Sequence, residues 1–274
     1  MSTNISGTIG VLCATGKSSS RVADRLEADG HSVRRLARST TPAFDWTRPE
    51  EWPAALAGLK ALYVVFVPDV AAPGADATVG QLLAVARDAG VERAVLLSGR
   101  GEDGAGRAEG VALASGIATT IVRASWFSQN FTEGMLVPVD GVIALPAGER
   151  REPFVDLDDI ADVVVAALTG DGHAGRVYEV TGPELLTFSE AADLIAEASG
   201  RPVQYVPLDL ETFRAAVAEE AGDELADMLT ELCREVFDGR NESLTDGVRQ
   251  ALGREPRSLR DVLARAGANT EAAA

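Results

Sequence analysis

The sequence is poor in the residues that carry several common chemistries. Only two of its 274 residues are cysteine and two are histidine. Cys13 and Cys233 provide no disulfide framework, which favours a reducing compartment, so we expect a cytoplasmic protein. His31 and His173 are isolated, and neither has a second histidine or cysteine at the spacing of metal ligands. We therefore expect no metal site.

Two catalytic signatures are missing as well. No GxSxG elbow is present, which argues against an α/β-hydrolase. None of the three tyrosines is followed by a lysine four positions later, so the tyrosine–lysine pair of short-chain dehydrogenases is absent. Hydride transfer tolerates these losses, because a bound cofactor carries the chemistry and the protein supplies orientation and electrostatics.

Charge and hydropathy narrow the range of partners. The formal net charge of −17 argues against binding to nucleic acid or to an anionic membrane surface. No apolar run approaches the length of a membrane-spanning helix. The chain length and the 46% content of hydrophobic residues suit one large core with a small appended lobe. A small-molecule substrate is the expected partner, and the sequence carries no signature of an oligomeric state.

The segment from residue 8 to residue 38 has the pattern of a strand–turn–helix–strand unit. Thr8 to Leu12 is a short apolar run with β-branched residues, which is typical of a buried strand. Apolar residues at helical spacing follow, a glycine ends the helix, and residues 31–37 form a second strand. In such a unit the turn lies at the helix N-terminus, where free amide groups and the helix dipole attract phosphate.

The turn resembles the glycine fingerprint of a dinucleotide-binding fold in which two glycines are replaced. The spacing GxxGxxG places Cys13, Gly16 and Ser19 at the three glycine positions. Gly16 keeps the role of close approach to a diphosphate, whereas Cys13 stands where the turn is tight. The predicted cofactor-binding residues of this loop are Cys13, Thr15, Gly16, Lys17, Ser18 and Ser19. The alternative is an ordinary strand–helix turn with no ligand.

Three further cofactor contacts are predicted beyond this loop. An arginine after the second strand accommodates the 2′-phosphate of NADP, and Arg38 is placed there, so NADP is favoured over NAD. A solvated basic strand edge is the alternative. Asp45 either lines an adenine site or belongs to a contact with the next helix. Pro68 follows the apolar run of residues 59–67, whose loop is expected at the functional edge of the sheet.

Strands and helices alternate through residue 123. This pattern predicts an α/β fold, namely a doubly wound parallel-sheet Rossmann fold with a smaller C-terminal α/β lobe. We expect residues 1–150 to form the NAD(P)-binding Rossmann domain. Residues 151–274 are expected to form the smaller substrate-side lobe, partly interleaved with the first domain. Ligands of such sheets lie beyond the carboxyl ends of the strands.

The loops after the fourth and fifth strands supply the predicted catalytic groups. Ser98 can hydrogen-bond a substrate carbonyl, and Arg100 or Asn130 can stabilise developing oxyanion charge. Glu109 is either a proton source or a solvated helix residue. Apolar walls with a few polar groups orient small ligands, and the loop after residue 124 has this composition. The predicted substrate-binding residues are Trp126, Phe127, Gln129 and Asn130.

Six segments together carry a family resemblance. They are CATGKSSSRVADRL, FDWTRPEEW, GVERAVLLSGRGE, TIVRASWFSQNF, PAGERREPFVDLDDIADVVVAAL and GRVYEVTGPELLTF. With them the chain resembles, over nearly its whole length, the NmrA-like group of atypical short-chain dehydrogenase/reductases, which includes quinone reductases and nucleotide-sensing regulators. The resemblance implies a Rossmann domain, an NAD(P) cofactor and a C-terminal lobe that frames the substrate. By position it implies a cofactor loop from Cys13 to Ser19, a second-strand arginine at Arg38 and a substrate loop from Ser125 to Phe131.

Two functional hypotheses follow from these residues. The leading one is an NAD(P)H-dependent oxidoreductase that reduces a small carbonyl, quinone or enone without a tyrosine–lysine pair, and Gly16 and Arg38 favour it. The alternative is a non-redox member of the same fold in which cofactor binding is weakened or lost. Such a protein would be a cyclase or isomerase acting on a bound metabolite, or a nucleotide-sensing regulator. Cys13 and Ser19 favour this alternative.

Overall fold

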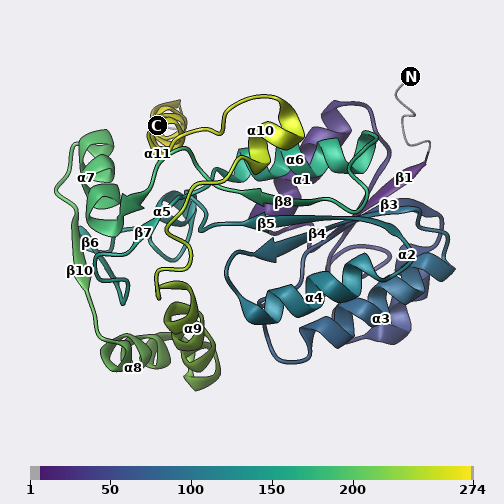
Figure 1. Cartoon of the computed structure of the whole chain (residues 1–274), viewed down its shortest axis with the longest axis horizontal. Helices are drawn as coiled ribbons and strands as arrows, with labels where there is room; N and C mark the ends of the chain where they lie inside the picture. Colours follow the sequence, from purple (N-terminus) through teal and green to yellow (C-terminus); the bar gives the residue numbers. More distant parts are fainter. Residues whose placement is uncertain (1–6, 273–274) are drawn as a thin grey trace.

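The computed structural model describes residues 7–272 and is built on one six-stranded parallel sheet (Figure 1). The sheet order is β2-β1-β3-β4-β5-β8, and every neighbouring pair is parallel. Its strands are β1 (Thr8–Leu12), β2 (Val33–Leu36), β3 (Leu59–Val64), β4 (Arg93–Gly99), β5 (Ala118–Ala124) and β8 (Val177–Val180). The order reverses direction at β1, between β2 and β3. The predicted doubly wound Rossmann fold is confirmed.

Helices cover both faces of this sheet (Figure 1). One face carries α1 (Lys17–Ala28), α6 (Leu157–Thr169) and α10 (Gly247–Leu252). The other face carries α2 (Trp52–Leu56), which follows a short 3-10 turn at Pro49–Glu51, α3 (Ala75–Asp88) and α4 (Asp103–Leu113). Strands buried on both faces need apolar side chains throughout. Accordingly, five of the six residues of β3 are buried.

The second and third strands are shorter than their sequence patterns predict. β2 begins at Val33 rather than at residue 31, and β3 ends at Val64 rather than at residue 67. Val65 and Phe66 are still half-buried against the core, whereas Val67 is 47% exposed. Hydropathy alone does not mark where ladder pairing stops, so the apolar run continues into the loop beyond the sheet.

The smaller lobe is built from two short two-stranded sheets and five helices. The sheets pair β6 (Val142–Leu145) with β10 (Gln204–Pro207) and β7 (Arg151–Glu152) with β9 (Leu186–Thr187). The helices are α5 (Asn130–Glu133), α7 (Phe188–Ser199), α8 (Leu210–Ala221), α9 (Asp223–Val236) and α11 (Leu259–Ala272). Phe154 lies at the centre of its core, with ring centroids 4.9 Å from Phe131 and 5.2 Å from Phe188. The predicted lobe is therefore present.

The chain passes more than once between the Rossmann part and the smaller lobe. β6 precedes residue 150 but pairs within the smaller lobe, whereas α6 and β8 follow residue 150 and complete the layers of the Rossmann sheet. The predicted division into residues 1–150 and 151–274 stays a prediction, and its first six and last two residues lie outside the described part. Within residues 7–272, no helix is both long and apolar enough to cross a membrane.

Candidate functional site: the carboxyl edge of the parallel sheet

The turn after β1 is made by a cysteine in a conformation that usually requires glycine. Cys13 has φ 51°, one of only two positive φ values at non-glycine residues in the described chain. The Gly16 N–H donates to the Cys13 carbonyl at 2.7 Å, and this hydrogen bond closes the turn. A left-handed conformation costs an L-residue with a side chain about 1–2 kcal/mol. The fold therefore keeps the tight turn although the first glycine of the fingerprint is missing.

The thiol of Cys13 is directed away from the helix that follows the turn. Its sulfur donates to the carbonyl of Val65, just beyond β3, over 3.5 Å. The indole N–H of Trp46 donates to the same carbonyl over 3.1 Å. Burial raises the pKa of the Cys13 thiol, and the neighbouring Trp46 and Arg38 offset part of that rise. The side chain is therefore packed under the end of β3, and the thiol is predominantly neutral at pH 7.

The N-terminus of α1 offers unpartnered amide groups to a ligand. Its N-cap is Gly16, which is exposed, and no side chain within the described chain caps the helix. The first turn contains no acidic residue. The amides of Lys17, Ser18 and Ser19 have no carbonyl partner within the helix, because the first amides of any α-helix lack one. The hydroxyl of Ser19 is buried and finds no partner among the described residues. These groups fit an anionic diphosphate.

Arg38 is the available arginine at the end of β2. It lies just past the strand, is exposed, and forms no hydrogen bond or ion pair with any residue from 7 to 272. Its charge lowers the pKa of both Cys13 and Asp45, so it lies near these two side chains. The other two arginines of this segment are engaged: Arg34 donates to two carbonyls at the C-terminal end of α2, and Arg35 pairs with acidic residues of α1.

The other two predicted cofactor contacts lie beside the same edge. The Asp45 carboxylate accepts hydrogen bonds from the backbone N–H and the hydroxyl of Thr47, which hold the pKa of Asp45 below its usual range. Its backbone carbonyl accepts from the indole of Trp52 at 2.8 Å. Pro68 is exposed beyond β3 and follows a cis peptide bond. Both residues stay predicted cofactor contacts.

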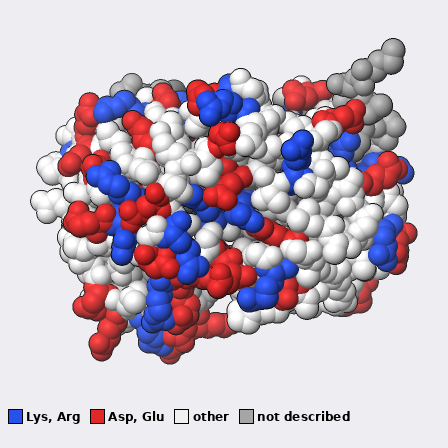
Figure 2. All heavy atoms as spheres, viewed as in Figure 1, with Lys and Arg blue, Asp and Glu red and all other residues white. Residues whose placement is uncertain are grey.

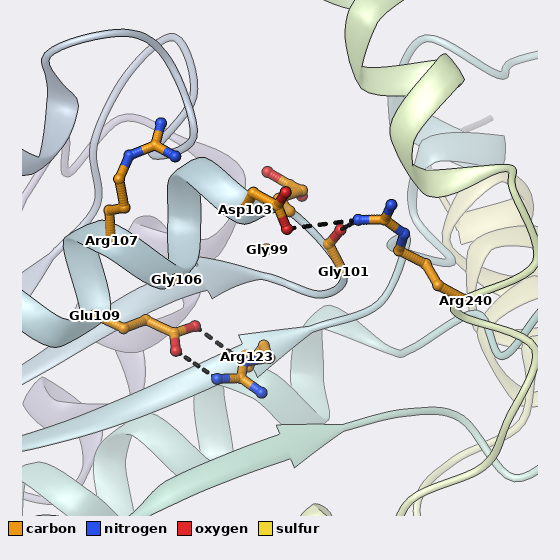
Figure 3. Close-up of a pocket in the computed structure, with 9 residues that line it drawn as sticks. Gly99, Gly101, Asp103, Gly106, Arg107, Glu109, Arg123 and Arg240 are labelled. Atoms are coloured by element: carbon orange, nitrogen blue, oxygen red, sulfur yellow. Dashed lines mark hydrogen bonds and ion pairs between the residues drawn. The ribbon is translucent and has the colours of Figure 1, made fainter.

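A hydrogen-bonded network joins the carboxyl ends of β4 and β5 to α4, and Figure 3 shows its pair of Glu109 and Arg123. Ser98 donates its hydroxyl to Glu109 at 2.6 Å, and Arg123 donates to both carboxylate oxygens of Glu109 at 2.9 and 2.5 Å. Arg123 also reaches Glu179 of β8 at 3.2 Å. Glu109 is only 4% exposed, so it is not a solvated helix residue. The predicted contact between Ser98 and substrate requires that its hydroxyl leave this network.

The structure gives Arg100 a different task from the predicted one. Its guanidinium is buried and donates to Glu179 at 2.7 Å, to the Asn241 carbonyl at 2.6 Å and to the Ser243 hydroxyl at 2.7 Å. The Asn241 side chain returns a hydrogen bond to the Arg100 carbonyl at 3.1 Å. Because the guanidinium is directed at protein groups, we revise its role from oxyanion stabilisation to attachment of residues 241–243 to the sheet.

The loop after β5 divides into core residues and cleft residues. Gln129 is buried, its amide nitrogen donates to Asp156 at 2.6 Å, and its amide oxygen accepts from the Leu157 N–H at 2.9 Å. Both ends of its side chain are thus used in holding the start of α6, and we revise its predicted substrate role accordingly. Trp126 is half-buried and packs against the core of the smaller lobe, with its ring 5.2 Å from that of Phe237 and tilted by 30° to it.

The other two predicted substrate residues are, like Trp126, partly accessible. Phe127 and Asn130 are both half-buried. Asn130 begins α5, and its side-chain oxygen and the ammonium group of Lys17 both lie close to Gly134. The first helix of the cofactor loop and the substrate loop therefore meet at these residues. A second link, the ion pair of Arg21 with Glu133, joins the same two elements.

A cavity of about 450 Å³ opens at the carboxyl edge of β4, between the sheet and the smaller lobe. It is lined by Gly99, Gly101, Glu102, Asp103, Gly106, Arg107, Glu109, Arg123 and Arg240. In Figure 3 Arg123 faces Glu109, Arg240 reaches Gly101 and Asp103, and Arg107 points away from Glu109. On the face drawn in Figure 2, side chains of both charges are interspersed over the junction of the two parts.

Sequence reasoning missed two acidic residues at this edge, Glu102 beside the cavity and Asp69 next to it. A signal was present, because Asp69 follows the third strand and Glu102 follows the fourth. Neighbouring parallel strands bring their carboxyl-end loops together. Arg240 gave no such signal, because it comes from a segment after α9 that only the folded chain brings to the sheet.

The strained turn makes a specific prediction about Cys13. Replacing it with valine should lower the free energy of unfolding by about 1–3 kcal/mol relative to replacing it with glycine, because a β-branched residue is poorly tolerated at positive φ. Chemical denaturation of both variants measures this difference. The control is Cys233, the other cysteine, which is buried within the helix α9. Valine should be tolerated better there, and equal losses at both positions would contradict the interpretation of the turn.

The parallel sheet with its reversal at β1, and the open helix N-terminus at that reversal, define a dinucleotide-binding Rossmann protein. No family model matches the sequence. The chain is 32% identical over 266 residues to "Uncharacterized oxidoreductase YesF" of Bacillus subtilis, covering 91% of this chain and 92% of that one. It is 35% identical over 222 residues to "NAD(P)H azoreductase" of Xenophilus azovorans, covering 76% of each.

A solved structure agrees with these relatives in fold. The triphenylmethane reductase of Citrobacter sp., crystallised with NADP(H), superposes with a TM-score of 0.79 at 20% identity, covering 94% of this chain and 99% of that one. The protein belongs to the NmrA-like family of atypical short-chain dehydrogenase/reductases.

Proposed function

We propose that this protein is an NADPH-dependent reductase of a small carbonyl, quinone or enone. The observation that carries the proposal is the open N-terminus of α1, which faces the reversal of the sheet behind a turn kept intact at Cys13. The names of the relatives support it, because one is an NAD(P)H azoreductase and another an oxidoreductase. The structural neighbour crystallised with NADP(H) supports it as well.

The residues that would hold the dinucleotide follow from the geometry of the edge. The amides of Lys17, Ser18 and Ser19 would bind the diphosphate, since a helix N-terminus favours negative charge. Arg38, which has no partner in the described chain, would bind the 2′-phosphate and so favour NADP over NAD. When bound, the reduced nicotinamide supplies a hydride. Phe127 and Asn130 would contact the substrate on the side of the smaller lobe.

Titration with nucleotides tests this function. A ligand present at one hundred times its dissociation constant should raise the free energy of unfolding by about 2.7 kcal/mol. We expect NADPH to raise the melting temperature of the purified protein more than NADH does at equal concentration. Loss of the reduced-nicotinamide absorbance on addition of a quinone or ketone would then identify a reductase. Absence of any shift with either nucleotide would contradict the proposal and favour a non-redox role for the fold.

A further inference from the structure

The cavity beside β4 lies where the reactive end of a bound dinucleotide would be. The inference drawn from this position rests on the proposed function. Arg38 fixes the adenosine half at the end of β2, and a dinucleotide crosses the reversal of such a sheet toward the strands on the other side. Here those strands are β3 and then β4. Asp69 follows β3, and Glu102 follows β4 and lines the cavity. In the proposed complex both carboxyl groups would lie on the side of the nicotinamide half.

Backbone geometry brings the carboxyl of Glu102 back onto the end of its own strand. A Cβ atom added to Gly99 would lie 1.9 Å from its Oε1 atom, so only glycine at position 99 leaves room for this carboxyl. The Oε2 atom is buried and has no hydrogen-bond partner in the described chain. Asp69 lies alongside, and its own Oδ1 accepts from the Ala71 N–H at 2.7 Å. A carboxyl without donors and beside another carboxylate is best accommodated in its protonated form.

The charges around Glu102 act in the same direction. Burial is the largest cause that raises the pKa of Glu102 well above its usual value, followed by the nearby Asp69 carboxylate and then by the charges of Glu235 and Glu109. The cations nearby have other carboxylate partners or are turned outward. Arg123 is bound by Glu109 and Glu179, Arg240 is bound by Asp103, Glu235 and Asp238, and Arg107 is exposed on α4.

We propose that Glu102 is the catalytic proton donor of the reduction. The substrate carbonyl carbon accepts a hydride, with its two electrons, from the reduced nicotinamide, while its oxygen takes the proton from the Glu102 carboxyl. The C–H bond of the reduced nicotinamide, the C=O π bond and the Glu102 O–H bond would break, and new C–H and O–H bonds would form on the substrate. The substrate would thus be reduced to the alcohol, with NADPH as the reductant. Water entering through the cavity returns a proton to the Glu102 carboxylate. The negative charge of Asp69 favours this step, because it disfavours the ionised form of Glu102. Asp69 is thus a positioning residue.

The activity test compares Glu102→Gln with the wild-type protein. Glutamine has nearly the same shape but cannot deliver the proton, and general acid catalysis contributes about 10²–10⁴-fold. We expect kcat for an aryl ketone to fall by at least about 100-fold, with Kd for NADPH unchanged within about twofold. The fall should be smaller for a 1,4-naphthoquinone, because a hydroquinone anion is a weaker base than an alkoxide. Asp69→Asn should shift the pH profile of kcat and leave KM unchanged.

The matched control is Glu152→Gln. Glu152 is also buried, and desolvation raises its pKa to about 8, but it lies on β7 and is not among the cavity-lining residues. We expect this variant to retain wild-type kcat for both substrates. A loss equal to that of Glu102→Gln would show that burial of an acid, rather than its place at the cavity, sets the rate.

A second readout needs neither cofactor nor substrate. Infrared difference spectra of the wild-type protein against Glu102→Gln at pH 7 should contain the carbonyl band of a protonated carboxyl. Folding raises the pKa of Glu102 from 4.5 to about 9. Between these two pH values the folded state keeps a proton that the unfolded state releases, so the free energy of unfolding falls as the pH rises from about 4.5 to about 9. In the Glu102→Gln variant the contribution of Glu102 to this pH dependence should be absent. The contribution of Glu152, whose pKa is raised to about 8, should remain up to about pH 8.

The outcomes separate this assignment from the proposed function. NADPH binding with a wild-type kcat in Glu102→Gln would overturn the role of Glu102 and leave the reductase intact. Absence of the protonated-carboxyl band at pH 7 would overturn it as well. Failure of the wild-type protein to bind NADPH would overturn both. A protonated Glu102, a large loss of kcat in Glu102→Gln and unchanged NADPH affinity would support the assignment.

Discussion

Replacing Arg38 with alanine should weaken NADPH binding by about 10- to 100-fold and leave NADH binding nearly unchanged. The two nucleotides differ only in the 2′-phosphate, and hydrogen bonds to a charged group contribute about 1.5–3 kcal/mol, where each 1.4 kcal/mol is a factor of ten in affinity. Because Arg38 has no partner among residues 7–272, its removal should not disturb the fold. Calorimetric or fluorescence titration of both proteins with both nucleotides measures the ratio.

A control variant makes the Arg38 result specific. Arg201 is exposed after α7 and has no ion pair in the described chain, so Arg201→Ala removes the same charge far from the N-terminus of α1. It should bind both nucleotides like the wild type. Equal weakening of NADPH and NADH by Arg38→Ala would show that Arg38 does not read the 2′-phosphate. Equal weakening by both variants would indicate a general effect of net charge.

Replacing Arg100 with methionine should produce the largest loss of stability, about 3–5 kcal/mol, because removal of one partner from a buried ionic group leaves the other partners uncompensated. The Asn241 carbonyl and the Ser243 hydroxyl would lose their donor, although Glu179 would keep Arg123. In a chain of this size the melting temperature should fall by about 2–4 °C for each kcal/mol.

The Arg100 result also has a matched control. Arg107 is exposed on α4 without a partner in residues 7–272, so Arg107→Met should change the free energy of unfolding by less than about 0.5 kcal/mol. Because Arg100 attaches residues 241–243, proteolysis of Arg100→Met should begin in that segment. A variant that melts with the wild type would show that the guanidinium is not needed there, and would return it to the list of groups free to contact a substrate.

The arrangement of the sheet could be predicted because its signal is local. Each buried strand is a short apolar run, and each helix carries its own apolar stripe and terminating glycine, so the alternation can be seen in the sequence without any long-range contact. The same locality made the places of the loop after β1 and of Arg38 predictable, since these depend only on where β1 and β2 end, and their contacts with a cofactor stay predictions. Segment ends were less accurate, because ladder pairing rather than hydropathy ends a strand.

The candidate site could be predicted only in part, because the use of a polar side chain depends on distant partners. Gln129 has the composition of a substrate contact, yet Asp156, 27 residues later, takes its amide. Arg100 follows a strand at the functional edge, yet its partners lie 79 and more than 140 residues away. Nothing local in a sequence distinguishes a glutamine or arginine held by such partners from one left open to a ligand.

By itself, the sequence determined the class of fold, and it predicted the edge of the sheet, the helix N-terminus and the arginine that we propose receive a dinucleotide. The physical reason is that hydrophobic periodicity and turn chemistry act over a few residues. Only the tertiary structure decided that Cys13 could replace a glycine by adopting positive φ, that Arg100 and Gln129 were structural, and that two acids met beside a cavity. Those outcomes depend on burial and on charges brought together from remote segments, and both exist only once the chain has folded.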